Sequence, residues 1–358
     1  MNTVASGASR RGYIDWLRGV LVLIMIEAHT LDAWTRLDVR QNGVYGWAMI
    51  VGGFGAPGFL FLAGIALALA GGSRLRRGRT RAEAAALARH RALQIFGLAF
   101  LFRLQSWLIS GGDPAQALLK VDILNIMGLS MLAAAILWGL GRLRWDRFAW
   151  LAGATVLIAM ITPVVRSSPW LSPLPDPIEW YIRPIPGRGT FTLFPWAGFL
   201  LAGAAAGVWL DSGRTPEDER RINIAFGVLG TTLVAAAYGA SLLPSIYRES
   251  SFWTTSPTFF FLRLGVLILS MPVAYAWNRA WRGRSVLQEF GRASLFIYWI
   301  HVELAYGVLS GPIHKTLTLG QAFLAYALFT IALFGAAKLK DQIVDWWNIG
   351  RLQPSGAL

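Results

Sequence analysis

The sequence predicts an all-α, polytopic integral membrane protein, and three observations support this prediction. Hydrophobic residues make up 55% of the 358 residues, whereas charged residues make up only 15%. Several uninterrupted apolar runs exceed about 18 residues, the length that a helix needs to cross a bilayer. Basic residues gather in alternate connecting segments, as they do in cytoplasmic loops of membrane proteins. These features together indicate about ten transmembrane helices.

The apolar runs give the expected helices in chain order. They cover residues 13–35, 46–70, 89–109, 122–140, 148–165, 189–210, 222–243, 258–277, 293–310 and 318–338. The first run is too long for the core of a signal peptide and lacks a small-residue cleavage site, so we expect it to be retained. The predicted organisation is an N-terminal tail (1–12), one transmembrane domain (13–340) and a C-terminal tail (341–358).

Basic residues orient these helices. The segment SRLRRGRTRAEAAALARHR (73–91) and the other arginine-rich loops fall on one side, and the alternate loops are poor in Lys and Arg. The positive-inside rule therefore predicts that both termini are cytoplasmic, in a multi-pass protein of the inner membrane. The same bias accounts for most of the net charge of +14, and we expect no nucleic-acid partner.

The chain has no cysteine. Disulfides, thiolate metal sites and an acyl-cysteine intermediate are therefore excluded. We expect no metal site.

One segment on the expected outer side differs from the other loops. SSPWLSPLPDPIEWYIRPIPGRG (167–189) is rich in proline and aromatic residues, so it cannot be helical throughout. Two interpretations remain open, an ordered rim of a substrate site and a connector with interfacial aromatic anchors.

The first expected helix carries an unusual set of polar residues. Asp15, Arg18 and His29 fall on one helical stripe, with Asp15 and Arg18 at the cytoplasmic end and His29 in the outer half. Glu27 points to nearly the opposite side. Charged groups in hydrocarbon are costly and usually have partners or a function. A structural ion pair and a packing histidine are the alternatives to a functional role.

Other helices bring polar residues to a similar depth. Ser294, Tyr298 and His301 share one face of the ninth helix, at spacings of four and three. The remaining candidates on the outer half are Arg103, Asp122, Asn125, Arg188, Trp196 and Arg263. Polar groups at one depth must find one another or water.

Gly203 and Gly207 are spaced four apart, which allows close helix packing.

Five motifs in order carry a family resemblance. They are DWLRG (15–19) followed by His29, GAPGFLFLAGIAL (55–67), VDILNIMGLS (121–130), LFPWAGFLLAGAAAG (193–207) and FGRASLFIYWIHVEL (290–304). The chain resembles the heparan-α-glucosaminide N-acetyltransferase catalytic-domain-like family, the YeiB-like transmembrane acyltransferases, as a bacterial-type member. The resemblance covers nearly the whole chain.

The resemblance implies a transmembrane acyltransferase-like domain over residues 13–340. It would move an acetyl group from cytoplasmic acetyl-CoA, a co-substrate rather than a bound cofactor, to an amino sugar or other glycan on the outer side. The expected partners are membrane lipid, acyl-CoA and the glycan acceptor, and the oligomeric state is left open between monomer and homodimer.

Acyl transfer needs a base for the acceptor proton and donors for the developing oxyanion. His29, His301 and Asp122 are the candidate catalytic residues, with Asp122 or Glu303 orienting a histidine. The candidates for binding the substrate or the donor are Asp15, Arg18, Arg103, Asn125, Arg188, Trp196, Arg263, Ser294 and Tyr298.

One departure and two rival functions accompany this hypothesis. The animal members place a proposed catalytic histidine in the loop after the first helix, where this chain has none; His29 matches an asparagine position of theirs and His301 a shared histidine. The rivals are an acyltransferase-3-type O-acyltransferase of surface glycans and a transporter of a glycan or small molecule. The lack of evident repeats counts against the transporter.

Overall fold

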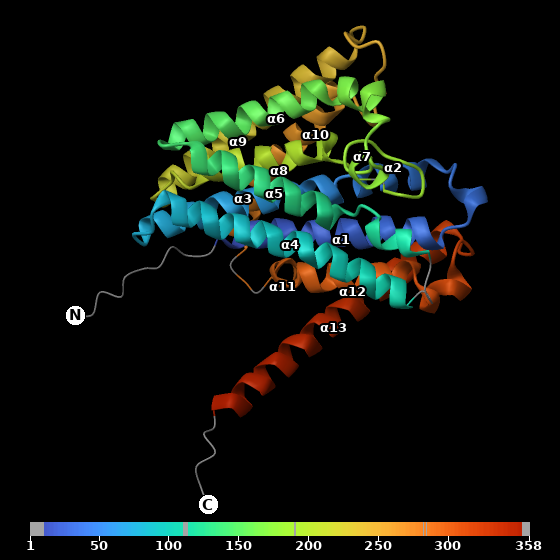
Figure 1. The fold of residues 1–358 in the computed structure, drawn as a ribbon. Helices are drawn as coiled ribbons and strands as arrows, with labels where there is room; N and C mark the ends of the chain where they lie inside the picture. Colours follow the sequence, from blue (N-terminus) through green and yellow to red (C-terminus); the bar gives the residue numbers. More distant parts are fainter. Residues whose placement is uncertain (1–10, 110–113, 190, 282, 284, 353–358) are drawn as a thin grey trace, which may run out of the picture. The chain divides into compact units, whose positions relative to one another are not determined.

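The computed structural model describes residues 11–109, 114–189, 191–281, 283 and 285–352. These residues form helices joined by turns and longer loops, with three isolated β-bridges (Figure 1). The α-helices are α1 (Gly12–Trp34), α2 (Gly43–Gly52), α3 (Gly55–Arg76), α4 (Arg81–Ile109), α5 (Ile123–Leu140), α6 (Arg144–Ser167), α7 (Asp176–Glu179), α8 (Leu193–Leu210), α9 (Pro216–Ser241), α10 (Pro257–Ala280), α11 (Val286–Arg292), α12 (Ser294–Tyr306) and α13 (Leu319–Leu352). The 3₁₀ turns are η1 (Leu37–Val39), η2 (Ala115–Leu119), η3 (Pro169–Leu171) and η4 (Val308–Ile313).

Eight helical segments of the described chain are long and apolar enough to cross a membrane. They are α2 with α3 as one segment, α4, α5, α6, α8, α9, α10 and α13. This confirms the predicted all-α, polytopic membrane protein.

The sequence predicted about ten transmembrane helices, and the two that are not among the eight are α1 and α12. They match the first and ninth expected helices. Helix α1 carries four charged residues, Asp15, Arg18, Glu27 and Asp32, and α12 has only 13 residues. Neither helix is therefore among the eight.

Helix boundaries follow the local sequence. Asp122 caps α5 in a capping box with Asn125, and Thr215 caps α9 in a capping box with Asp218. The expected second helix is interrupted between Gly52 and Gly55, so that it forms two helices. Helix α13 continues to Leu352, past residue 340 where the sequence suggested the start of a tail.

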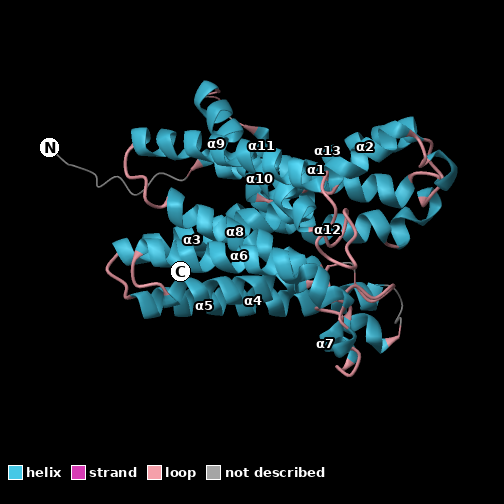
Figure 2. Ribbon diagram, turned by 90° about the horizontal axis from the view of Figure 1, so that it is seen from above, coloured by secondary structure: helices cyan, strands magenta, loops and turns pink. Residues whose placement is uncertain are grey.

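The chain divides into two compact units. Unit 1 contains residues 1–55 and 283–358, and unit 2 contains residues 56–282. In unit 1, helix α1 packs against α2, α11, α12 and α13. In unit 2, the main packed pairs are α4 with α5, α6 with α8, α5 with α8, and α9 with α10. The loops of unit 2 lie at the two ends of these helices (Figure 2).

Close backbone contacts hold α3 against α8 within unit 2. A Cβ atom added to Gly203 would lie 1.9 Å from the carbonyl oxygen of Phe61, and one added to Gly64 would lie 2.0 Å from that of Leu200. At Gly207 the nearest atom, the carbonyl oxygen of Ile65, would be 2.8 Å away. The close approach predicted from Gly203 and Gly207 is therefore confirmed.

Candidate functional site

Two histidines meet in unit 1. Nδ1 of His29, on α1, lies 2.8 Å from Nε2 of His301, on α12. The two rings are nearly parallel, with an interplanar angle of 7° and centroids 4.9 Å apart. The similar depth that the sequence predicted for these residues thus corresponds to direct contact.

The hydrogen bonds of His301 assign the protons of the pair. Nδ1 of His301 lies 2.9 Å from the carbonyl oxygens of Ile297 and Tyr298. Carbonyl oxygens only accept, so this Nδ1 carries a proton. In the neutral ring Nε2 then accepts, and Nδ1 of His29 donates to it. The basic lone pair of neutral His29 is consequently on Nε2.

Burial separates the roles that the two rings can play. His301 has no exposed surface, whereas His29 is only partly buried. Since a base must reach the proton it removes, His29 is the better placed of the two for contact with a substrate. His301 instead fixes the orientation and tautomer of the His29 ring.

A polar network borders His29. The ring of Tyr306 lies edge-on to that of His29, with the ring centroids 5.7 Å apart. The Tyr306 hydroxyl donates to Oδ2 of Asp32 over 2.9 Å. Oδ1 of Asp32 pairs with Arg40 at 3.3 Å. Sequence reasoning did not select Asp32 or Tyr306, although Asp32 follows His29 by three residues on the same side of α1.

The other polar residues of α1 have structural surroundings. Asp15 is buried and pairs with Arg18 at 3.1 Å. The backbone of α1 touches α11 here: a Cβ on Gly291 would lie 1.9 Å from the carbonyl oxygen of Asp15. Glu27 faces α2, with Oε2 3.9 Å from the position of a Cβ on Gly52. These contacts fit helix assembly.

Tyr298 and Ser294 lie on α12 in unit 1. The Tyr298 ring is 5.8 Å from that of His301, in a tilted arrangement. Ser294 is the first residue of α12, and it is partly buried. Ser294, Tyr298 and His301 thus belong to one helix, as the sequence predicted.

The remaining predicted residues belong to unit 2. Arg103 pairs with Oδ2 of Asp122 at 2.7 Å, and Oδ1 of Asp122 accepts from the Ile123 amide at 2.6 Å. Oδ1 of Asn125 accepts from the Asp122 amide at 2.9 Å. These are the contacts of a helix cap with an ion pair, and the catalytic role suggested for Asp122 stays a prediction.

The proline-rich segment forms an ordered rim in unit 2. It contains η3 and α7, and the amide of Val121 donates to the carbonyl of Arg188 over 3.1 Å. Trp180 is buried against Val121 and Ile126, and the Arg188 guanidinium lies over the Trp180 ring at 5.2 Å. Burial raises the pKa of Tyr181 in this rim, while a hydrogen bond with Asn125 opposes the rise. These contacts show that the segment is ordered, and both interpretations, a rim of a substrate site and a connector with interfacial aromatic anchors, stay predictions.

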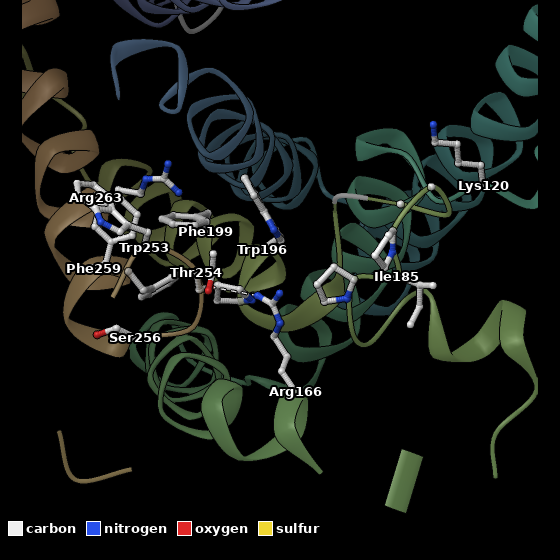
Figure 3. A pocket seen from close by; sticks show the side chains of 16 residues that line it. Lys120, Arg166, Ile185, Trp196, Phe199, Trp253, Thr254, Ser256, Phe259 and Arg263 are labelled. Atoms are coloured by element: carbon white, nitrogen blue, oxygen red, sulfur yellow. Dashed lines mark hydrogen bonds between the residues drawn. The ribbon is translucent and has the colours of Figure 1, made fainter. Parts of the chain in front are cut away.

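The rim borders a cavity of about 470 Å³. Figure 3 shows it between the aromatic residues Trp196, Phe199 and Phe259. Arg263, predicted from the sequence, lines it, as do Arg166 and Lys120, which sequence reasoning missed. The sequence signal that could have identified Arg166 and Lys120 is their position outside the arginine-rich loops, on the side where basic residues are few.

Comparison with known protein families gives a match over more than half of the chain. Residues 10–235 match the family model described as "Heparan-alpha-glucosaminide N-acetyltransferase, catalytic". The match includes His29 and the unit 2 candidates from Arg103 to Trp196, and it ends within α9, before Arg263 and His301. A comparison with curated proteins gives no match.

Proposed function

The chain belongs to the heparan-α-glucosaminide N-acetyltransferase catalytic family, and from this premise we propose that it transfers an acetyl group from cytoplasmic acetyl-CoA to an amino sugar or other glycan acceptor on the outer side of the membrane. Family membership supports a transferase in a multi-pass membrane protein. The observation that carries the proposal for this chain is the contact of His29 with His301 at 2.8 Å.

In the proposed reaction His29 is the general base. Its Nε2 takes a proton from the acceptor amine as the amine nitrogen bonds to the carbonyl carbon of the thioester. When the carbon–sulfur bond breaks, that proton passes to the CoA sulfur. Transfer is direct, and the chain has no cysteine for an acyl-cysteine intermediate.

His301 is a positioning residue in this mechanism. It holds Nδ1–H of His29 and so keeps the lone pair on the opposite nitrogen, Nε2. Tyr298, beside His301, is the proposed donor to the developing oxyanion. Asp15 and Arg18 lie at the opposite end of α1 and contribute to activity indirectly, through the packing of α1.

The test is acetyl transfer in sealed vesicles. Vesicles with labelled acetyl-CoA on the cytoplasmic face and glucosamine on the other should form labelled N-acetylglucosamine, and the His29→Ala variant should not. Survival of the product under mild alkali distinguishes an amide from the ester that an O-acyltransferase forms. Uptake of unmodified labelled glucosamine without acetyl-CoA would instead support the transporter.

A further inference from the structure

The cavity bordered by the proline-rich rim is lined by three cationic residues from separate elements. Arg166 is at the C-terminal end of α6, Arg263 is in the second turn of α10, and Lys120 precedes α5. All three are partly buried. In Figure 3 the two arginines border the aromatic part, and Lys120 lies on the far side of Ile185.

The described residues that line this cavity include no Asp or Glu. Arg166 donates to the backbone carbonyl of Thr254 over 3.1 Å, and the Arg263 guanidinium lies over the Phe259 ring at 4.4 Å. Burial and the neighbouring Arg103 lower the pKa of Lys120, with Asp122 opposing the change. The cavity therefore concentrates positive charge at a partly desolvated place, which favours an anion.

Topology does not explain these cations. At the other end of the same helices, a second cavity of about 270 Å³ is lined by Arg76, Arg144, Arg147 and Arg214. That end carries the arginine-rich loops, so its charge follows from the positive-inside rule. The end with Lys120 and Arg166 is the one where basic residues are expected to be few, yet three of them line one cavity.

The aromatic side chains indicate where this cavity lies with respect to the bilayer. Trp253 lines it and is 60% exposed, and Trp170, in the rim segment, is 86% exposed. Exposed tryptophans gather at the level of the lipid head groups. At this level, next to aromatic and proline surfaces, the phosphate of an amphiphile is an anion that would suit the cavity. Guanidinium groups bind phosphate through paired hydrogen bonds.

We propose that this cavity binds a phosphate-bearing head group, with Arg166 and Arg263 holding the phosphate and Trp196 and Trp253 covering the apolar part next to it. The chemistry is shared by a phospholipid head group and a soluble phosphate ester. The proposal does not depend on acyl transfer.

The experiment measures binding to the full-length protein purified in a neutral detergent. The probes are dioctanoyl-phosphatidylglycerol, glycerol 3-phosphate and dioctanoylglycerol, which lacks phosphate. Thermal stabilisation and native mass spectrometry report binding of each probe. We expect the phosphatidylglycerol to bind and dioctanoylglycerol not to bind. Binding of glycerol 3-phosphate with equal affinity would support the phosphate site and identify its source as soluble.

Variants locate the site. Arg166→Gln and Arg263→Gln should each weaken phosphatidylglycerol binding about tenfold, as expected for loss of one charge-assisted contact. Arg248→Gln is the matched control, because Arg248 is exposed and does not line the cavity. If the Arg263 variant fails to fold, Arg166→Gln alone tests whether the cavity binds the phosphate. Equal binding by dioctanoylglycerol, or unchanged binding by both variants, would overturn the proposal.

Discussion

His29 donates from Nδ1 to Nε2 of His301 across 2.8 Å, and His301 is itself held by two backbone carbonyls of α12. The proton order follows from these acceptors alone, since a carbonyl oxygen cannot donate. The pair thus presents one defined nitrogen, Nε2 of His29, as its basic atom.

Replacing the two histidines should have different effects on catalysis. His29→Ala removes the proposed base and should lower kcat roughly 100-fold to 10,000-fold with little change in Tm. His301→Gln keeps a side-chain oxygen that can accept from His29, so it should lose less activity than His301→Leu. The measurements are acetyl transfer from labelled acetyl-CoA and thermal unfolding of each variant.

A pH profile separates positioning from mere packing. If His301 sets the basicity of His29, His301→Gln should move the acidic limb of the kcat/KM profile, whereas a packing defect would lower activity equally at every pH. Near-wild-type transfer by both His29→Ala and His301→Leu would refute the catalytic assignment.

The depth of these histidines was readable from the sequence because helical periodicity fixes which residues share a face. His29 and His301 lie 272 residues apart, and the sequence predicts their similar depth but not their contact. The network of Asp32 and Tyr306 was not predicted, because its contacts depend on how α1 and α12 pack. Periodicity describes one helix at a time.

Other features depend on tertiary structure in the same way. The apolar run of the second expected helix gave no sign of the interruption between Gly52 and Gly55. Lys120 and Arg166 each read as an isolated cation near a helix end, and only the fold brings them to one cavity with Arg263.

The contact of α1 with α11 should tolerate no side chain at Gly291. A Cβ there would lie 1.9 Å from the carbonyl oxygen of Asp15, so Gly291→Ala must displace α11. We expect a destabilisation of about 1–3 kcal/mol, measured as a lower Tm. Gly335→Ala in α13 is the control, since no atom lies within 4 Å of a Cβ at that position. Equal Tm values for the two variants would show that α1 and α11 do not pack this closely.

The contact of α3 with α8 gives a second packing prediction. Gly203→Leu should lower expression and Tm strongly, because its Cβ alone would lie 1.9 Å from the carbonyl oxygen of Phe61. Gly153→Leu makes the same chemical change at an exposed position of α6 with open space around it. It should leave Tm nearly unchanged. A similar loss in both variants would mean that leucine itself, and not the contact, is responsible.

Asp122 offers a direct comparison of a structural and a catalytic role. Asn is also a good N-cap, so Asp122→Asn should keep the cap of α5 and lose the charge that pairs with Arg103. Asp122→Ala loses both, and removal of the cap alone costs about 1 kcal/mol. For a structural role we expect Tm to fall in the order wild type, Asn, Ala, with kcat following Tm. A large fall of kcat in the Asn variant at unchanged Tm would indicate a catalytic carboxylate.

The orientation of the chain can be measured directly because the sequence contains no cysteine. Arg77→Cys places one thiol in the exposed arginine-rich segment after α3, and Arg248→Cys places one in the exposed segment before α10. If the arginine-rich loops are cytoplasmic, a membrane-impermeant maleimide should label Arg248→Cys in intact cells and Arg77→Cys only after lysis. Labelling of both variants after lysis is the control for accessibility. The opposite pattern in intact cells would invert the orientation and place His29 in the cytoplasmic half.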